Sequence, residues 1–136
     1  MKLIICIDDR RGMTFFRRRQ SRDIRVTEDI IRDLGASTLF VSPYSSKLFA
    51  ELDASTKIAA DPIAAARGKE GAVVFLEDTP TPSDLSEIDT VVLYLWGKTY
   101  PADKFFDADL SGYRLRSRAC FVGNSHEQIT KETYVK

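Results

Sequence analysis

The chain has 136 residues, enough for one domain that buries a substantial core. Its 43% hydrophobic and 29% charged residues exclude an intrinsically disordered protein, and a formal net charge of zero excludes one that holds nucleic acid by its overall charge. No apolar run approaches the roughly 18 residues of a membrane span, and no signal-peptide pattern opens the chain. We therefore expect a single cytoplasmic domain over residues 1–136 with no membrane partner.

Strand-like and helix-like segments alternate along the first 76 residues. In chain order, the pattern predicts strands at 3–7, 38–41, 57–59 and 72–76 and helices at 23–34, 44–52 and 61–68. Such alternation is typical of a parallel sheet with right-handed crossovers. Later segments, at 90–96, 113–122 and 129–135, are strand-like, and the short Gly-Asn loop between the last two favours a hairpin. The expected fold is α/β, with a mostly parallel central sheet, flanking helices and a C-terminal antiparallel hairpin.

The segment after the first strand concentrates positive charge. Between residues 10 and 25 stand seven arginines, one acid and no lysine. A loop at the carboxyl end of a central strand is where open α/β sheets place their ligands. Because so many like charges repel one another unless anions neutralise them, we expect an anionic or nucleotide-like ligand there. The arginines assigned to this site are Arg10, Arg11, Arg17, Arg18, Arg19 and Arg22.

The same charges also allow a structural interpretation. Asp8 and Asp9 adjoin the arginines, and residues 77–89 contain five acids and no base. Pairing between these groups, within the fold or across a dimer interface, would also neutralise the arginines. A homo-oligomer formed through the basic and acidic faces is therefore an alternative to ligand binding.

Two further features bear on nucleic acid and on catalysis. Phe15 and Phe16 beside the arginines offer base stacking together with phosphate contacts, although adjacent phenylalanines are more often buried anchors of a loop. His126 is the single histidine and, with Glu127 or Glu132, is a candidate for a metal-free ribonuclease. A histidine beside a Gly-Asn turn, however, usually faces solvent. Nucleic acid is therefore an alternative partner that the sequence does not favour.

The two cysteines, Cys6 and Cys120, both lie in apolar strand-like runs. We expect them to be small buried side chains rather than a disulfide or a metal pair. One histidine and two separated cysteines do not have the spacing of a zinc site. The chain contains no P-loop, no dinucleotide-binding glycine motif and no serine-nucleophile elbow, so the sequence predicts neither a metal nor a cofactor.

The order of these segments resembles that of the dihydrofolate reductases. Residues 2–13 resemble the first strand and mobile loop of that family, and 23–34 with 39–42 its next helix and strand. Residues 102–107 with 113–115 are similar to its closing segment, and 130–135 to its last strand. The resemblance implies the family's α/β fold and, for a complete member, NADPH-dependent reduction of a pterin-like substrate.

Three departures from this family change the expected function. Val26 lies close to the position of the family's helix carboxylate, which leaves Asp23, one turn earlier on the same face, as the stand-in acid. The phosphate-binding arginine after the second strand is missing, although Ser45 and Ser46 still place hydroxyls at a helix start. Residues 78–89 contain no glycine and are too few for the elements that hold the dinucleotide. We therefore expect neither NADPH binding nor reductase activity.

The arginine-rich opening and residues 125–132 are also similar to short uncharacterised bacterial proteins that are sometimes labelled ribonuclease Z. That enzyme needs several histidines and an aspartate around its metal, which the single His126 cannot provide. The leading interpretation is a cytoplasmic binding protein of dihydrofolate reductase-like fold that takes an anionic ligand at its arginine-rich segment. RNA binding or metal-free RNA cleavage, and a pterin-type reductase that uses Asp23, are the alternatives.

Overall fold

The computed structural model describes residues 1–50, 52 and 55–136. Within this part of the chain, no helix is both long and apolar enough to cross a membrane. The elements in chain order are β1 (Lys2–Ile7), β2 (Gly12–Phe15), β3 (Arg18–Arg19), α1 (Ile24–Leu34), β4 (Leu39–Val41), α2 (Pro43–Phe49), β5 (Thr56–Ile58), α3 (Pro62–Ala66), β6 (Val73–Leu76), β7 (Thr90–Leu95), β8 (Lys104–Phe105), β9 (Arg114–Phe121) and β10 (Ile129–Val135).

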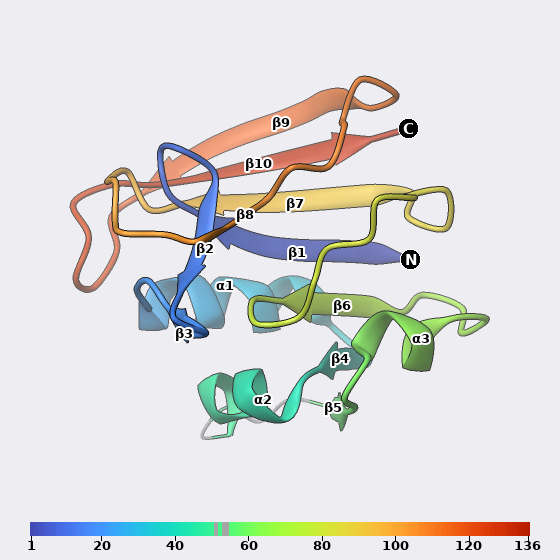
Figure 1. Ribbon diagram of the computed structural model, residues 1–136. Helices are drawn as coiled ribbons and strands as arrows, with labels where there is room; N and C mark the ends of the chain where they lie inside the picture. Colours follow the sequence, from blue (N-terminus) through green and yellow to red (C-terminus); the bar gives the residue numbers. More distant parts are fainter. Residues whose placement is uncertain (51, 53–54) are drawn as a thin grey trace.

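A seven-stranded sheet forms the centre of the molecule (Figure 1). Its strand order is β5-β4-β6-β1-β7-β10-β9. Strand β1 pairs in parallel with both β6 and β7, whereas β10 pairs antiparallel with β7 and with β9. The prediction of a mostly parallel central sheet that ends in an antiparallel hairpin is therefore confirmed.

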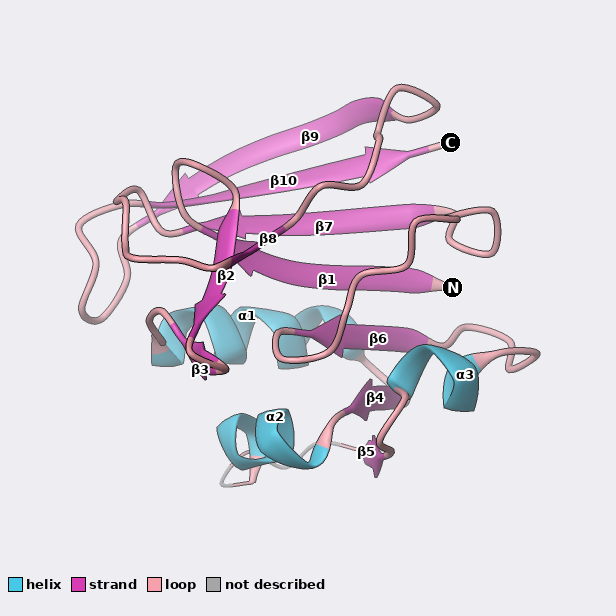
Figure 2. Cartoon of the chain, viewed as in Figure 1, coloured by secondary structure: helices cyan, strands magenta, loops and turns pink. Residues whose placement is uncertain are grey.

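Side chains of β1 alternate between two cores, one on each face of the sheet. Leu3 and Ile5 join the core beneath α3 and a small second sheet, while Ile4 joins the core beneath α1. Helix α1 buries Val26 and Ile30 at the predicted helical spacing. Figure 2 shows β2 and β8 crossing in front of the central strands, on the side away from α1. This three-layer arrangement leaves the carboxyl end of β1 at the start of α1.

The arginine-rich segment is a hairpin rather than the expected open loop. Strands β2 and β3 pair antiparallel, and β8 pairs with β2 to complete a three-stranded sheet. Phe16 and Arg17 both have positive φ, at 49° and 62°, and form the two-residue turn. The sequence analysis missed all three strands because they span two to four residues and the turn lacks the usual Asn-Gly signal.

The connection between β6 and β7 contains no helix, as the departures from the family predicted. Residues 77–89 cross back along the sheet as turns and irregular backbone. The Tyr113 hydroxyl fixes this connection by donating to the carbonyl oxygens of Leu85 and Ile88. Residues 77–89 therefore form neither a helix nor a strand between β6 and β7.

Two other expectations need correction. The helix predicted over 44–52 ends at Phe49, and residue 51 of that range lies outside the described residues. Cys120 is exposed rather than buried, because β9 is the last strand of the sheet and its residues are exposed along nearly its whole length. Cys6 is half-buried, and neither thiol is in a disulfide.

Candidate functional site

Two adjoining pockets open near the carboxyl end of β1, beside the start of α1. The inner pocket has a cavity volume of about 20 Å³, room for about one water molecule, between Cys6, Phe75 and Trp96. The outer pocket has a volume of about 430 Å³, which lies within the usual range of small-molecule sites. Residues that line both pockets are Arg22, Asp23, Thr27 and Leu48. The two pockets therefore form one continuous candidate site.

The outer pocket combines an apolar wall with two cations. Ile24, Leu48 and Leu52 supply the apolar wall, and the exposed side chains of Arg22 and Lys47 supply the positive charge. Among the described residues, Arg22 forms no ion pair. This chemistry suits a ligand that has an apolar body and a negative group.

The structure brings only two of the six predicted arginines to this site. Arg22 lines both pockets and Arg19 lines the inner one. Arg17 and Arg18 are exposed at the tip of the hairpin. The other two, Arg10 and Arg11, are exposed in the turn after β1, where the Arg11 guanidinium lies 5.0 Å from the centre of the Phe106 ring. The six arginines, although close in sequence, therefore do not form a single cluster in the structure.

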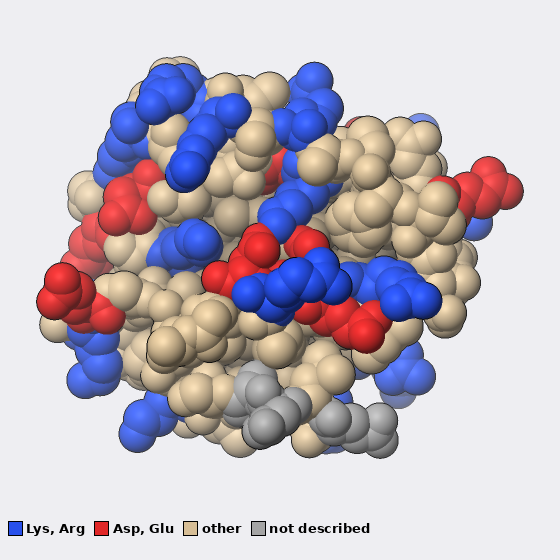
Figure 3. All heavy atoms as spheres, turned by 180° about the vertical axis from the view of Figure 1, so that it is seen from behind, with Lys and Arg blue, Asp and Glu red and all other residues tan. Residues whose placement is uncertain are grey.

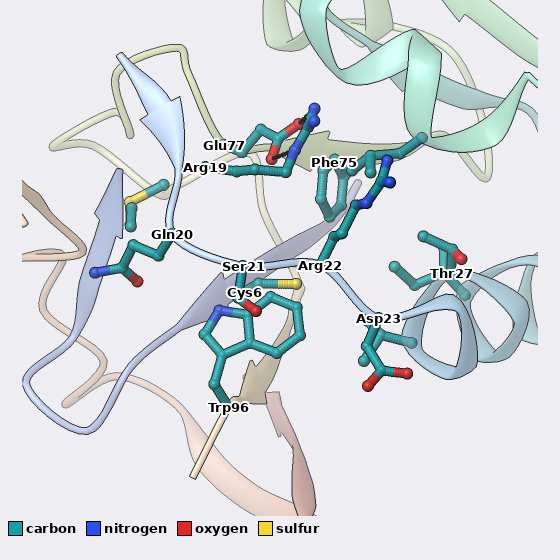
Figure 4. A pocket seen from close by; sticks show the side chains of 14 residues that line it. Cys6, Arg19, Gln20, Ser21, Arg22, Asp23, Thr27, Phe75, Glu77 and Trp96 are labelled. Atoms are coloured by element: carbon teal, nitrogen blue, oxygen red, sulfur yellow. Dashed lines mark hydrogen bonds and ion pairs between the residues drawn. The ribbon is translucent and has the colours of Figure 1, made fainter. Parts of the chain in front are cut away.

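Arg19 is engaged with Glu77 at the carboxyl end of β6 (Figure 4). The two side chains form a two-bond pair, with Nη2 at 2.9 Å from Oε2 and Nε at 3.1 Å from Oε1. The guanidinium also lies 4.3 Å from the centre of the Tyr44 ring. Burial would lower the pKa of Arg19, but its bonds to Glu77 outweigh that effect and raise it. This pair confirms, for one arginine, the structural interpretation of the basic segment.

The two serines assigned to an anion seat also bind protein acceptors. Ser45 is buried and donates to Glu77 Oε2 at 2.7 Å, and Ser46 donates to the carbonyl oxygen of Pro43 at 2.7 Å. Nearby, Ser42 donates to Asp78 Oδ1 at 2.7 Å. The polar side chains at this end of β6 and β4 thus use their hydrogen-bonding groups on one another.

The residues after β6 do not fit the phosphates of NADPH. Glu77 and Asp78 place two carboxylates at the strand end, where the phosphates would need backbone donors or cations, and no helix follows. Burial and the nearby Glu77 carboxylate also raise the pKa of the Cys6 thiol. Cys6 is therefore a neutral wall of the inner pocket rather than a reactive thiolate.

His126 is buried, so the expectation that it faces solvent is wrong. Its Nδ1 lies 2.8 Å from Asp23 Oδ2, and its ring stacks on the ring of Trp96 with centres 4.8 Å apart. On the other side of the ring, Nε2 lies 2.9 Å from Ser21 Oγ and 3.2 Å from the Tyr100 hydroxyl. The histidine therefore connects a carboxylate to two hydroxyl groups, of which that of Ser21 lines the inner pocket.

Asp23 is the residue that organises this cluster. Its side chain has no exposed surface, and it caps α1 by accepting from the backbone N–H of Arg25 at 2.9 Å. It also accepts from the backbone N–H groups of Asn124 and Ser125, at 2.8 and 2.9 Å. Burial would raise the pKa of Asp23, but these bonds and the one from His126 hold it well below its ordinary value. The Asp23 carboxylate therefore joins the start of α1 to the turn between β9 and β10.

The partners considered for His126 in RNA cleavage lie elsewhere. Glu132 is buried on β10 and pairs with Arg118, whose Nη2 lies 2.7 Å from its Oε2. Glu127 is exposed. Nor does the described part of the chain place three or more His, Cys, Asp or Glu side chains where they could hold a metal ion.

Several site residues were missed in the sequence, above all Lys47, Trp96 and Tyr100. Trp96 was assigned only to the strand-like segment 90–96, and nothing in the pattern linked the other two to a site. Their placement depends on how α2 and the chain after β7 pack against the start of α1, which periodicity alone does not encode.

Charge on the rear of the molecule is mixed rather than segregated. Figure 3 shows positive and negative side chains interspersed over this face. Opposite charges are also paired on α1, where Asp29 pairs with Arg32 and with Lys131 of β10, and Asp33 also pairs with Lys131. An oligomer built from separate basic and acidic faces stays a prediction.

Comparison with known proteins identifies the fold. No protein-family model matches the chain, and no curated protein sequence matches it. Among solved structures, it is similar to a dihydrofolate reductase from Enterococcus faecalis complexed with NADP(H) and RAB-propyl. The TM-score is 0.66 at 14% sequence identity, over 98% of this chain and 94% of that chain. The predicted dihydrofolate reductase-like fold is thus confirmed, and at this identity the likeness concerns the fold alone.

Proposed function

We propose that the protein binds a small anionic ligand with a flat, largely apolar body, as nucleotides and folates have, in the outer pocket. The observation that carries this proposal is a cavity of about 430 Å³ whose apolar wall of Ile24, Leu48 and Leu52 is flanked by Arg22 and Lys47. The body would pack on the apolar wall while the cations bind the negative group. The position agrees with the general placement of ligands at the carboxyl edge of α/β sheets.

The proposal includes the absence of reductase activity. Two carboxylates, Glu77 and Asp78, follow the carboxyl end of β6 and would repel the phosphates of a dinucleotide there, and Arg19 and Ser45 bind Glu77 rather than a ligand. Asp23, the stand-in acid of the reductase alternative, is held as a carboxylate by backbone donors, and an acid with a lowered pKa is a poor proton donor near neutral pH. We expect no NADPH oxidation with dihydrofolate present.

Calorimetric titration with folate and with ATP tests the proposal. We expect measurable binding of at least one of them, and a roughly tenfold loss of affinity in Arg22→Ala, because a charge-assisted hydrogen bond contributes about 1.5–3 kcal/mol. Arg18→Ala is the matched control, since Arg18 is exposed on the hairpin away from both pockets. If neither probe binds, or if both variants lose affinity equally, the proposal fails.

A second candidate is single-stranded nucleic acid at the hairpin tip. The expectation that Phe15 and Phe16 are buried anchors is wrong: they are 37% and 74% exposed, and their ring centres lie 4.1 Å apart. Arg17 and Arg18 are exposed beside them, so aromatic faces and cations occur together, as in single-strand binders. Binding of a labelled oligouridylate should weaken steeply with salt and in Phe16→Ala. A flat salt response removes this candidate.

A further inference from the structure

We propose that the Ser21 hydroxyl is an activated nucleophile, served by His126 and Asp23, that accepts a short acyl group from a small ester. The inference does not depend on the ligand proposed above. It rests on the relative positions of three side chains that come from two distant segments: residues 21–23 before α1, and the turn between β9 and β10.

The three side chains form a continuous hydrogen-bonded chain. Ser21 Oγ lies 2.9 Å from His126 Nε2, and His126 Nδ1 lies 2.8 Å from Asp23 Oδ2. Hydroxyl, imidazole and carboxylate in this order are the arrangement by which hydrolases of unrelated folds activate a serine. Recognition of such a triad depends on geometry and roles, so the lack of a sequence motif around Ser21 does not count against it.

The surroundings assign a role to each nitrogen of the imidazole. Backbone N–H groups of Asn124 and Ser125 hold Asp23 as a carboxylate, which accepts from Nδ1. Nε2 of a neutral ring is then left with its lone pair, and the nearer of its two hydroxyl neighbours is Ser21. Stacking on Trp96 keeps the ring in this orientation. His126 is therefore placed as a general base for the Ser21 proton.

Ser21 also has a pocket in which to act. It is half-buried and lines the inner pocket beside Cys6 and Trp96 (Figure 4), where the open volume is about 20 Å³. That space has room for about one water molecule, so a long acyl chain is excluded and even an acetyl group reaches into the adjoining outer pocket. The outer pocket, which shares Arg22 with the inner one, has room for the alcohol part of the ester. The substrate class is thus a short-chain ester, and an anionic alcohol part would gain from Arg22.

The reaction balances with water as the only co-reactant. The Ser21 proton passes to His126 Nε2 as Oγ bonds to the carbonyl carbon, and the same proton goes to the departing alcohol as its C–O bond breaks. Water then attacks the acyl-serine, gives a proton to Nε2 and releases the acid, and that proton returns to Oγ. Tyr100, whose hydroxyl is 3.2 Å from Nε2, is the neighbouring group that can donate to the developing oxyanion.

A second serine beside the imidazole shows why Ser21 is singled out. Ser125 Oγ also touches the imidazole, at 3.2 Å from Nδ1, and lies 3.3 Å from Asp23 Oδ2. Nδ1 carries the proton that it donates to Asp23, so it cannot take one from Ser125. Ser125 is therefore also in contact with the histidine but is not activated, although it is more exposed than Ser21.

Phenylmethylsulfonyl fluoride and 4-nitrophenyl acetate, applied to the full chain, test the inference. The sulfonyl fluoride forms an Oγ–S bond and releases fluoride, so peptide mapping by mass spectrometry should find the adduct on Ser21. Ser21→Ala should abolish the adduct and ester turnover, and His126→Gln should slow both at least a hundredfold. Ser83→Ala, at an exposed serine between β6 and β7 that lines neither pocket, should leave both unchanged. Tyr100→Phe should lower kcat more than it changes KM.

Because His126→Gln removes a buried contact, thermal unfolding must first show that each variant is folded. Should that variant unfold, Ser21→Cys replaces it: its thiol should react with iodoacetamide faster than Cys6 and Cys120. An adduct confined to other residues, no adduct, or ester turnover that survives in Ser21→Ala would overturn the inference.

Discussion

Two regions at the same edge of the sheet have opposite character. Beside β6, Glu77 is enclosed by Arg19 and Ser45, so its charge and hydrogen bonds are satisfied within the fold. Beside α1, Arg22 faces an open pocket and forms no ion pair among the described residues. Arg19 and Arg22 are three positions apart in the chain. A local run of arginines therefore identifies a basic segment but not the role of each arginine in it. That role depends on partners elsewhere in the fold, which make one arginine structural and leave another available to a ligand.

The region beside β6, where Arg19 and Ser45 enclose Glu77, should lose the most stability on mutation. Glu77→Ala leaves the largely buried Arg19 guanidinium without its carboxylate, and breaking a buried pair costs about 3 kcal/mol or more of the free energy of unfolding. Glu87→Ala is the control, because the exposed Arg67–Glu87 pair should contribute under about 1 kcal/mol. Urea unfolding measures both. Equal losses of unfolding free energy in the two variants would show that the Arg19–Glu77 pair stabilises the fold no more than a surface pair does.

Asp23 should come next, with a loss of about 2 kcal/mol in Asp23→Ala, since it caps α1 and bonds the turn between β9 and β10. Its pKa is lower in the folded than in the unfolded protein. The stabilisation is therefore present above about pH 4, the unfolded value, and is lost as the pH falls through the folded value.

The difference in unfolding free energy between wild type and Asp23→Ala should accordingly shrink on acidification below about pH 4. Asp61→Ala removes the exposed cap of α3 and should cost about 1 kcal/mol, which makes it the control for loss of a cap alone. A gap between wild type and Asp23→Ala that stays constant down to pH 2 would contradict the assigned hydrogen bonds.

The region beside α1, where Arg22 faces the open pocket, should tolerate substitution without loss of stability. Arg22→Ala is expected to change the free energy of unfolding by less than about 0.5 kcal/mol, as for surface residues in general, while it weakens anionic ligands. Arg19→Ala, by contrast, leaves the buried Glu77 carboxylate without its cation and should cost about 3 kcal/mol, as Glu77→Ala does. Thermal unfolding of the two variants compares them directly. A stability loss in Arg22→Ala as large as in Arg19→Ala would erase the distinction between the regions.

The hairpin tip should show the smallest effects. Phe16 is 74% exposed, so Phe16→Ser should leave the melting temperature and the affinity for folate or ATP unchanged within error. A marked drop in either would mean that the tip folds back onto the pockets, which the structure does not show.

Much of the fold could be predicted from the sequence, because apolar runs such as 72–76 and 90–96 bury both faces of a central strand and leave a strong pattern. The candidate site was less predictable. His126 was expected in solvent because its burial depends on Asp23, 103 positions away, and on stacking with Trp96. Whether Arg19 and Arg22 are paired or face the pocket depends likewise on Glu77 and α2. A local sequence pattern does not indicate such distant partners.

The most direct test of the central claim is to map binding residue by residue. Amide chemical shifts of the labelled protein, followed by NMR during titration with folate and with ATP, report which region takes the ligand. The largest changes should fall at residues 22–27, 47–48 and 124–125, and be lost in Arg22→Ala. Changes centred instead on residues 42–46 and 77–79, beside β4 and β6, would contradict the assignment of the open pocket as the ligand site.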